Sequence, residues 1–320
     1  METYLKKQGL SVQYSVRNIV NNCGMYVPQS VDDWEESAWN GGNFITSSAY
    51  LLRWNGPISE SADPYVNAQT GIVRLGYDSP TLPPEAHLQR MCLVPARTSS
   101  TDNDGLKRAI MEFGGVYVSM CAQGYSEETD KWGHYTWNPN SYGAYYLPNG
   151  DLDPTHAVTV VGWDDTYSKE NFNKNFANTG YSGPAGNGAF IVKDSYGNDK
   201  FRDNGYIYVS YYDAVFARKQ PACAFPIEPT VDNYSRVYQY DTYGWMDSFS
   251  LNDSAGRVYS RGYAAAMYEA EEDSHLAAVG FYATQPAAQY KIAIYSGCTA
   301  GAPTSGDCLV EQEGVADEYA

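Results

Sequence analysis

The 320-residue sequence lacks three features, and each absence excludes a class of protein or partner. Its six cysteines include no Cys-x-x-Cys pair, so a metal site of the zinc-finger kind is not expected. No apolar run is long enough for a transmembrane helix, so we expect no membrane insertion within this chain. Positive charge is scarce, because 21 Lys and Arg stand against 38 Asp and Glu, for a net charge of −17. An acidic surface repels nucleic acid and anionic membranes, and we exclude both as partners.

What is present indicates an extracellular protein of two domains. Apolar residues make up 43% of the chain, which is enough for a sizeable core, and the length exceeds that of a usual single domain. Thirty tyrosines and 29 glycines accompany few lysines, a composition typical of β-rich proteins that are secreted or displayed on a cell surface. Helical patterns over residues 1–8, 15–21, 45–54 and 105–113 come first, and strand patterns dominate afterwards.

Two segments carry polar residues at the ends of apolar strands. Residues 155–164 read THAVTVVGWD, and residues 188–197 read GAFIVKDSYG. His156 opens the first strand and Asp194 closes the second, so antiparallel pairing would bring an imidazole and a carboxylate together at one edge of a sheet. A catalytic histidine requires an orienting partner of this kind.

These segments resemble the C-terminal half of papain-like cysteine peptidases. In that family the base lies in a His-Ala-Val-x-x-Val-Gly-Trp/Tyr strand, and its orienting residue lies in an Ile-Val-Lys-Asn-Ser-Trp-Gly strand. Residues 1–9 resemble the end of the family's nucleophile helix, residues 40–42 its Asn-Gly-Gly, and residues 56–65 its Gly-Pro-Val-Ser-Glu stretch. The resemblance covers residues 1–215. It implies an α+β fold of two lobes, one helical and one β-barrel-like, with the active site in the cleft between them.

The resemblance also implies catalytic roles. His156 is the expected base, and Asp194 orients it at a position where the family has Asn. Tyr196 stands where the family has a Trp that shields the pair. The substrate is then a peptide or protein, and acyl transfer of this type requires neither a metal nor an organic cofactor.

Four further residues are expected to bind the substrate. Gly41 and Gly42 match the family's glycines, whose backbone bonds an extended peptide at a distance that only glycine allows. Phe44 and Ala157 are expected to line the site for a substrate side chain near the scissile bond.

One departure from the family pattern is important. None of the six cysteines lies in the family's Gly-x-Cys-Trp-Ala-Phe setting, and the oxyanion-hole Gln is also missing. We therefore expect the nucleophile to lie about two helical turns upstream of Met1, and this chain alone to be inactive. The alternative is a catalytically dead protein of the same family that binds a peptide or a glycan.

The C-terminal region is interpreted as a second domain. Residues 216–235 are rich in proline and are predicted to be a linker. Residues 236–320 resemble the lectin-like β-domain that follows the peptidase in some bacterial and archaeal members. This resemblance is carried by Tyr240-Asp241, Gly244-Trp245 and residues 278–282. It implies a partial β-sandwich, cell-wall glycan as a second partner, and a bacterial or archaeal cell surface as the location.

The strands expected in this second domain are short and separated by turns. Their pattern, which is typical of a β-sandwich, covers residues 237–241, 261–268, 275–282 and 289–295. Cys298 and Cys308 are ten positions apart and flanked by glycine and proline, which suits a disulfide that closes a loop.

Overall fold

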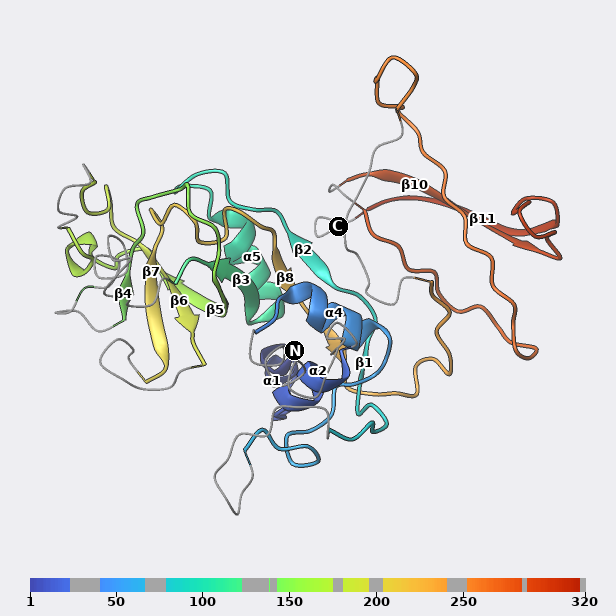
Figure 1. The fold of residues 1–320 in the computed structure, drawn as a ribbon, viewed down its shortest axis with the longest axis horizontal. Coiled ribbons are helices and arrows are strands. Elements are labelled where there is room, and N and C mark those ends of the chain that lie inside the picture. The colour runs from blue at the N-terminus through green and yellow to red at the C-terminus, as the bar shows by residue number, and fades with distance from the viewer. Residues whose placement is uncertain are drawn as a thin grey trace, which may run out of the picture.

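The computed structural model describes residues 1–23, 41–66, 79–122, 138, 143–174, 181–195, 204–240, 252–283 and 287–316. Within these ranges, three short helices come first and a β-rich half follows, which confirms the α+β prediction. Figure 1 shows the N-terminal helices grouped beside a sheet, and the C-terminal hairpin as a separate arm.

The predicted helices form where their sequence signals place them. They are α1 (Glu2–Lys7), α2 (Val16–Asn22), α4 (Phe44–Leu52) and α5 (Asp104–Phe113). Side chains cap two of them: the hydroxyl of Ser15 accepts the Asn18 N–H, and Asn43 and Thr46 form a reciprocal capping box. In the described ranges, no helix combines the length and the apolar character needed to cross a membrane.

A seven-stranded sheet forms the centre of the β-rich half. Its strand order is β2-β8-β3-β5-β6-β7-β4, and every pair is antiparallel except β4 with β7. The strands are β2 (Cys92–Val94), β3 (Val116–Met120), β4 (Ala144–Tyr145), β5 (His156–Asp164), β6 (Ala189–Lys193), β7 (Tyr206–Ser210) and β8 (Ala222–Ala224). A one-turn 3-10 helix, η1 (Lys169–Asn171), lies between β5 and β6.

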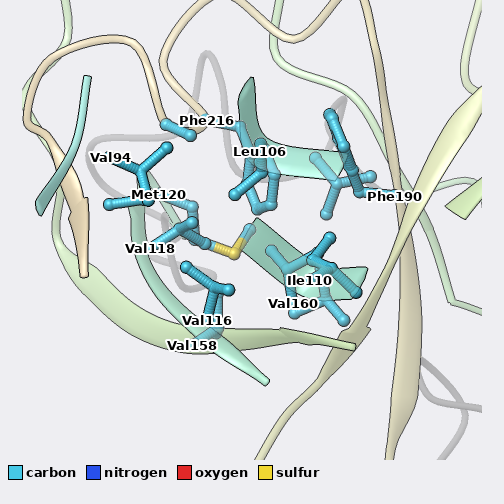
Figure 2. Packing of buried hydrophobic residues seen from close by; sticks show 14 of the residues in the cluster. Val94, Leu106, Ile110, Val116, Val118, Met120, Val158, Val160, Phe190 and Phe216 are labelled. Atoms are coloured by element: carbon cyan, nitrogen blue, oxygen red, sulfur yellow. The ribbon is translucent and has the colours of Figure 1, made fainter. Parts of the chain in front are cut away.

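Helix α5 packs on this sheet and closes the main core, which Figure 2 shows. Its apolar core residues recur at helical spacing and are buried, so one stripe of the helix faces the strands. Burying each large apolar side chain contributes roughly 1.5–3 kcal/mol. The helix contributes Leu106, Ala109, Ile110 and Phe113, and the sheet contributes Val116, Val118, Val158, Val160 and Phe190.

The helical region has a buried polar network in addition to its apolar cluster. Arg17 and Asp63 form an ion pair that is almost inaccessible to solvent. Asn18 donates to the second Asp63 oxygen at 2.7 Å, and Ser79 donates to the same oxygen. The Tyr50 hydroxyl donates to Asn18 Oδ1 at 2.7 Å, so the network joins α2, α4 and the loop that carries Asp63.

The linker prediction for residues 216–235 is wrong for most of that range. Strand β8 lies inside the sheet between β2 and β3, and β9 (Ile227–Glu228) pairs with β1 (His87–Leu88). Beyond β9, the backbone N–H of His87 donates to Thr230 O at 3.2 Å, and its Nδ1 lies 3.0 Å from Asn233 Oδ1. The prolines are tolerated because they lie between these short strands and not within them.

Among the described residues beyond β9, helices and strands are limited to one hairpin. Strands β10 (Gln289–Ser296) and β11 (Asp307–Val315) pair antiparallel with a bulge near Tyr295. Of the four strands predicted here, the structure contains the last. Residues 237–240, 261–268 and 275–282 are not strands, and Asp241 lies outside the described residues. In the described ranges these segments have no partner strand, and an extended segment needs pairing to count as a strand.

Candidate active site

His156 and Asp194 meet as the sequence predicts. The Nε2 atom of His156 lies 3.2 Å from Oδ1 of Asp194. The carboxylate is 2% exposed, whereas the imidazole is 21% exposed, so the carboxylate is buried behind a ring that solvent reaches. A buried carboxylate beside an accessible imidazole is the arrangement in which one group orients and the other reacts.

Strand pairing places both residues at this edge of the sheet. His156 is the first residue of β5 and lies opposite Met120, the last residue of β3. Asp194 directly follows β6, which pairs with β5, and its backbone N–H donates to Gly205 O at 2.9 Å. Backbone pairing within the sheet therefore fixes the positions of the two Cα atoms from which these side chains extend.

The atoms in contact determine the chemistry that the pair can perform. An ionised carboxylate at Nε2 holds a proton on that nitrogen and fixes the orientation of the ring. Nδ1 is then the nitrogen that takes up and releases a proton. In the part of the chain that the structure describes, no three His, Cys, Asp or Glu side chains are arranged to hold a metal ion.

The predicted substrate-binding glycines lie at the start of α4. Gly41 and Gly42 are exposed, and they lead directly into Asn43, the N-cap of that helix. Gly41 has a φ of +78°, a conformation that L side chains rarely adopt, and a Cβ there would meet no atom within 4 Å. The backbone at this point is therefore held in a glycine conformation beside open space.

Phe44, which follows Gly41 and Gly42 by two or three residues, packs against strand β3. It is the first residue of α4 and is buried, with its ring centroid 5.6 Å from that of Tyr117 in β3. Two residues farther along β3, Ser119 lies opposite Ala157, which is exposed. Phe44 thus packs between helix and sheet, while Ala157 faces solvent beside His156. Tyr196, the predicted shielding residue, lies outside the described residues.

The buried cysteines are poorly suited to act as nucleophiles. Four of the six are buried in the cores: Cys23, Cys92, Cys121 and Cys223. Burial raises the pKa of the Cys121 and Cys223 thiols, which opposes formation of the reactive thiolate.

The predicted disulfide between Cys298 and Cys308 is not formed in the structure. Both are free thiols, directed to the carbonyl groups of Pro303 and Val310 respectively. The register of the hairpin places Tyr295, and not Cys298, opposite Cys308. Cys298 lies beyond Ser296, the last paired residue of β10, so a spacing of ten positions does not place the two thiols opposite each other.

The sequence did not single out Ser119, whose buried Oγ has no hydrogen-bond partner among the described residues. It lies on β3 two residues after Tyr117, on the same face of the strand, and its strand partner Ala157 directly follows His156. The available signal was a single hydroxyl at the fourth position of the otherwise apolar strand VYVSM. That signal is weak without the pairing, because serine is common in strands of any function.

Comparison with known proteins agrees with this geometry. The family model named papain family cysteine protease matches residues 1–225, and the family model named lectin like domain matches residues 237–319. The structure of a variant of the clostridial cysteine protease Cwp84 after propeptide cleavage is 28% identical. The match covers 71% of this chain and 50% of that chain, with a TM-score of 0.50.

A second structure contains the cysteine protease and lectin-like domains of Cwp84, described as a surface layer associated protein of Clostridium difficile. It is 27% identical over 71% of this chain and 45% of that chain, with a TM-score of 0.49. The chain thus spans about half the length of these structures. The family model covers well over half of the chain, and the chain belongs to the papain family of cysteine proteases, with a lectin-like domain after the peptidase domain.

Proposed function

We propose that His156 and Asp194 are the base and the orienting residue of a cysteine endopeptidase whose nucleophilic Cys and oxyanion-hole Gln lie upstream of this chain. The observation that carries the proposal is the 3.2 Å contact between His156 Nε2 and Asp194 Oδ1, with the imidazole accessible to solvent and the carboxylate buried. None of the six cysteines has the family's nucleophile setting, which is why the nucleophile is assigned upstream.

The reaction proceeds in two acyl-transfer steps. The thiolate, paired with the His156 imidazolium, attacks the peptide carbonyl carbon and forms a tetrahedral intermediate. The C–N bond breaks as His156 gives its proton to the leaving amine, which leaves a thioester. His156 then accepts a proton from water, the resulting hydroxide attacks the thioester, and the acid product leaves while the thiolate is regenerated. Asp194 acts throughout by holding the proton on Nε2.

The substrate is proposed to bind in an extended conformation along Gly41 and Gly42. Exposed backbone that is fixed beside open space can pair with the main chain of a peptide as a strand edge does. Phe44 packs against Tyr117 of β3, and the exposed Ala157 directly follows His156; both are proposed to contact a substrate side chain.

Hydrolysis of a protein substrate by the natural full-length protein tests this proposal. His156→Ala is expected to lower kcat by roughly 10²–10⁴-fold because the proton-transfer group is lost. Asp194→Ala should lower kcat less, since the base remains but is no longer oriented. His275→Ala is the matched control, because His275 is an exposed histidine of the C-terminal region. Unchanged hydrolysis by His156→Ala would contradict the proposal, and peptide binding without hydrolysis by the wild type would favour the catalytically dead alternative.

A second proposed activity is glycan binding by the C-terminal domain. Tyr240 and Tyr268 stack with centroids 4.9 Å apart, and Tyr240 is 66% exposed. Exposed aromatic faces pack well against the apolar faces of sugars, and the acidic charge of the chain disfavours anionic glycans. An array of neutral oligosaccharides should therefore show binding that Tyr240→Ala removes. Tyr263→Ala, which alters a tyrosine that is 88% exposed, is the control.

We further propose that the protein acts outside the cell, on a bacterial or archaeal surface. The tyrosine-rich, acidic composition supports this location, as does the surface-layer association stated for Cwp84. Brief external proteolysis of intact source cells should release peptides of this chain. Their recovery only from lysed cells would refute the assignment.

A further inference from the structure

Tyr145 joins one edge of the sheet to the end of strand β3. It lies in β4, the edge strand, and is 0% exposed. Its hydroxyl donates to the backbone carbonyl oxygen of Cys121, the residue that directly follows β3. Three strands, β5, β6 and β7, stand between β4 and β3 in the sheet order. The hydrogen bond therefore links two strands that are not neighbours in the sheet.

The carbonyl groups on either side of this bond are both held by Thr155, which directly precedes β5. The N–H of Thr155 donates to Met120 O at 2.9 Å, and its hydroxyl donates to Ala122 O at 3.2 Å. The hydroxyl of Tyr145 completes the set, so three successive carbonyl groups at the end of β3 are bonded. The backbone is fixed at the point where β5 begins, because each of these acceptors has a partner.

The position of His156 depends on this end of β3. Strand β5 pairs with β3 from its first residue, but with β6 only from Thr159 onward. In the described sheet, residues 156–158 are therefore paired on one side only, and His156 lies opposite Met120, the last residue of β3. Asp194 is held separately, by a backbone hydrogen bond to the residue before β7. A shift in the end of β3 would thus move the imidazole relative to the carboxylate.

We propose that Tyr145 is a positioning residue for His156, because its hydroxyl fixes the strand end that sets the 3.2 Å contact between His156 and Asp194. This inference rests on the proposed function. Cys121 is 1% exposed, so without the Tyr145 hydroxyl its carbonyl oxygen would be buried and unpaired. An unpaired buried acceptor is costly, and the strand end would move to find another partner.

The substitution Tyr145→Phe tests this role, since it removes one oxygen atom and keeps the ring in the core. In the natural full-length protein, kcat for peptide hydrolysis should fall about tenfold, because a small misplacement of the proton-transfer group is costly. KM should change by less than about twofold, since Gly41 and Gly42, which are proposed to bind the peptide, lie at the start of α4 and not in the sheet.

Tyr50→Phe is the matched control. Tyr50 is also 0% exposed, and its hydroxyl donates to a buried acceptor, Oδ1 of Asn18, at 2.7 Å in the helical region. Each substitution leaves a buried acceptor unpaired, so both should lower the thermal midpoint by a similar amount. At a temperature below both midpoints, only Tyr145→Phe should lower kcat. An equal fall in kcat for the two variants, or no fall for Tyr145→Phe, would overturn the inference. A Tyr145→Phe protein that does not fold would also overturn it, because the hydroxyl would then support the whole core.

A second readout separates this inference from the proposed function, because it requires no nucleophile. In this chain, labelled with ¹⁵N-histidine, the proton that Asp194 holds on Nε2 of His156 should give an NMR signal that His156→Ala identifies by its loss. Tyr145→Phe should broaden or remove the signal, since a loosened contact lets the proton exchange with water, and Tyr50→Phe should retain it.

The outcomes of the two measurements are distinct. If the full-length protein cleaves no peptide, the proposed function fails, and the NMR signal alone decides whether Tyr145 positions the imidazole. A signal that Tyr145→Phe leaves unchanged overturns the inference, whether or not peptides are cleaved. A wild-type chain without the signal would contradict the contact between His156 and Asp194 and overturn both proposals.

Discussion

Replacing Asp63 with Asn should destabilise the helical region strongly. Asp63 accepts from Arg17, Asn18 and Ser79, and it is almost fully buried. The substitution preserves the shape of the side chain but removes its charge and replaces one acceptor oxygen with a donor. The buried Arg17 guanidinium then loses its counter-charge, and the Asn18 amide faces either a second donor or a weaker acceptor.

The magnitude follows from the burial of the pair. Removing one partner of a buried ion pair typically costs about 3–5 kcal/mol, because the remaining charge cannot return to water. The side chains of Arg17 and Asp63 are 0% and 1% exposed, so solvent screening gives little relief. For a domain of this size, each kcal/mol lowers the thermal midpoint by about 2–4 °C, so the fall should be roughly 6–20 °C.

Urea and thermal unfolding, followed by tryptophan fluorescence, measure this effect. The matched control is Glu170→Gln, which breaks an exposed ion pair with Lys174 and should unfold close to the wild type. Asp63→Asn within about 1 kcal/mol of the wild type would refute the reasoning, because the network would then not depend on its charge pair.

Three further predictions concern stability and thiol reactivity. Burial raises the pKa of Asp213 to about 6, above its unfolded value of about 3.9, so its neutral form is favoured in the fold. The free energy of unfolding should therefore fall by about 3 kcal/mol as pH rises from 4 through 6. In Asp213→Asn, the free energy of unfolding measured with urea should depend less on pH across that range. Gly188→Ala should lower the thermal midpoint more than Gly41→Ala does. Gly188 has a φ of +111°, and a Cβ there would lie 2.3 Å from the Tyr211 ring, whereas a Cβ on Gly41 would face open space. Equal effects of the two substitutions would contradict this reasoning. Thiol titration of the native chain should detect Cys298 and Cys308, and only denaturation should expose the other four cysteines.

The sequence predicted the contact between His156 and Asp194 because the two residues lie at strand ends. His156 opens an apolar strand and Asp194 follows one, and antiparallel pairing of adjacent strands brings such ends together with few alternatives. The helices were equally accessible to prediction, since Ser15 and Asn43 cap them locally. Signals of this kind are complete within about ten residues and require no knowledge of the rest of the chain.

Other features depended on contacts between distant segments. Residues 222–224 look like part of a proline-rich linker, yet they pair between β2 and β3, which lie about a hundred residues earlier in the chain. The ion pair of Arg17 with Asp63 and the alignment of Ser119 with Ala157 likewise join positions that no local pattern connects. By itself, the sequence determined the helices, the strand ends and the family, because these depend on local chemistry. Only the tertiary structure decided which strands pair and which charges are buried together, because those outcomes depend on which segments meet in space.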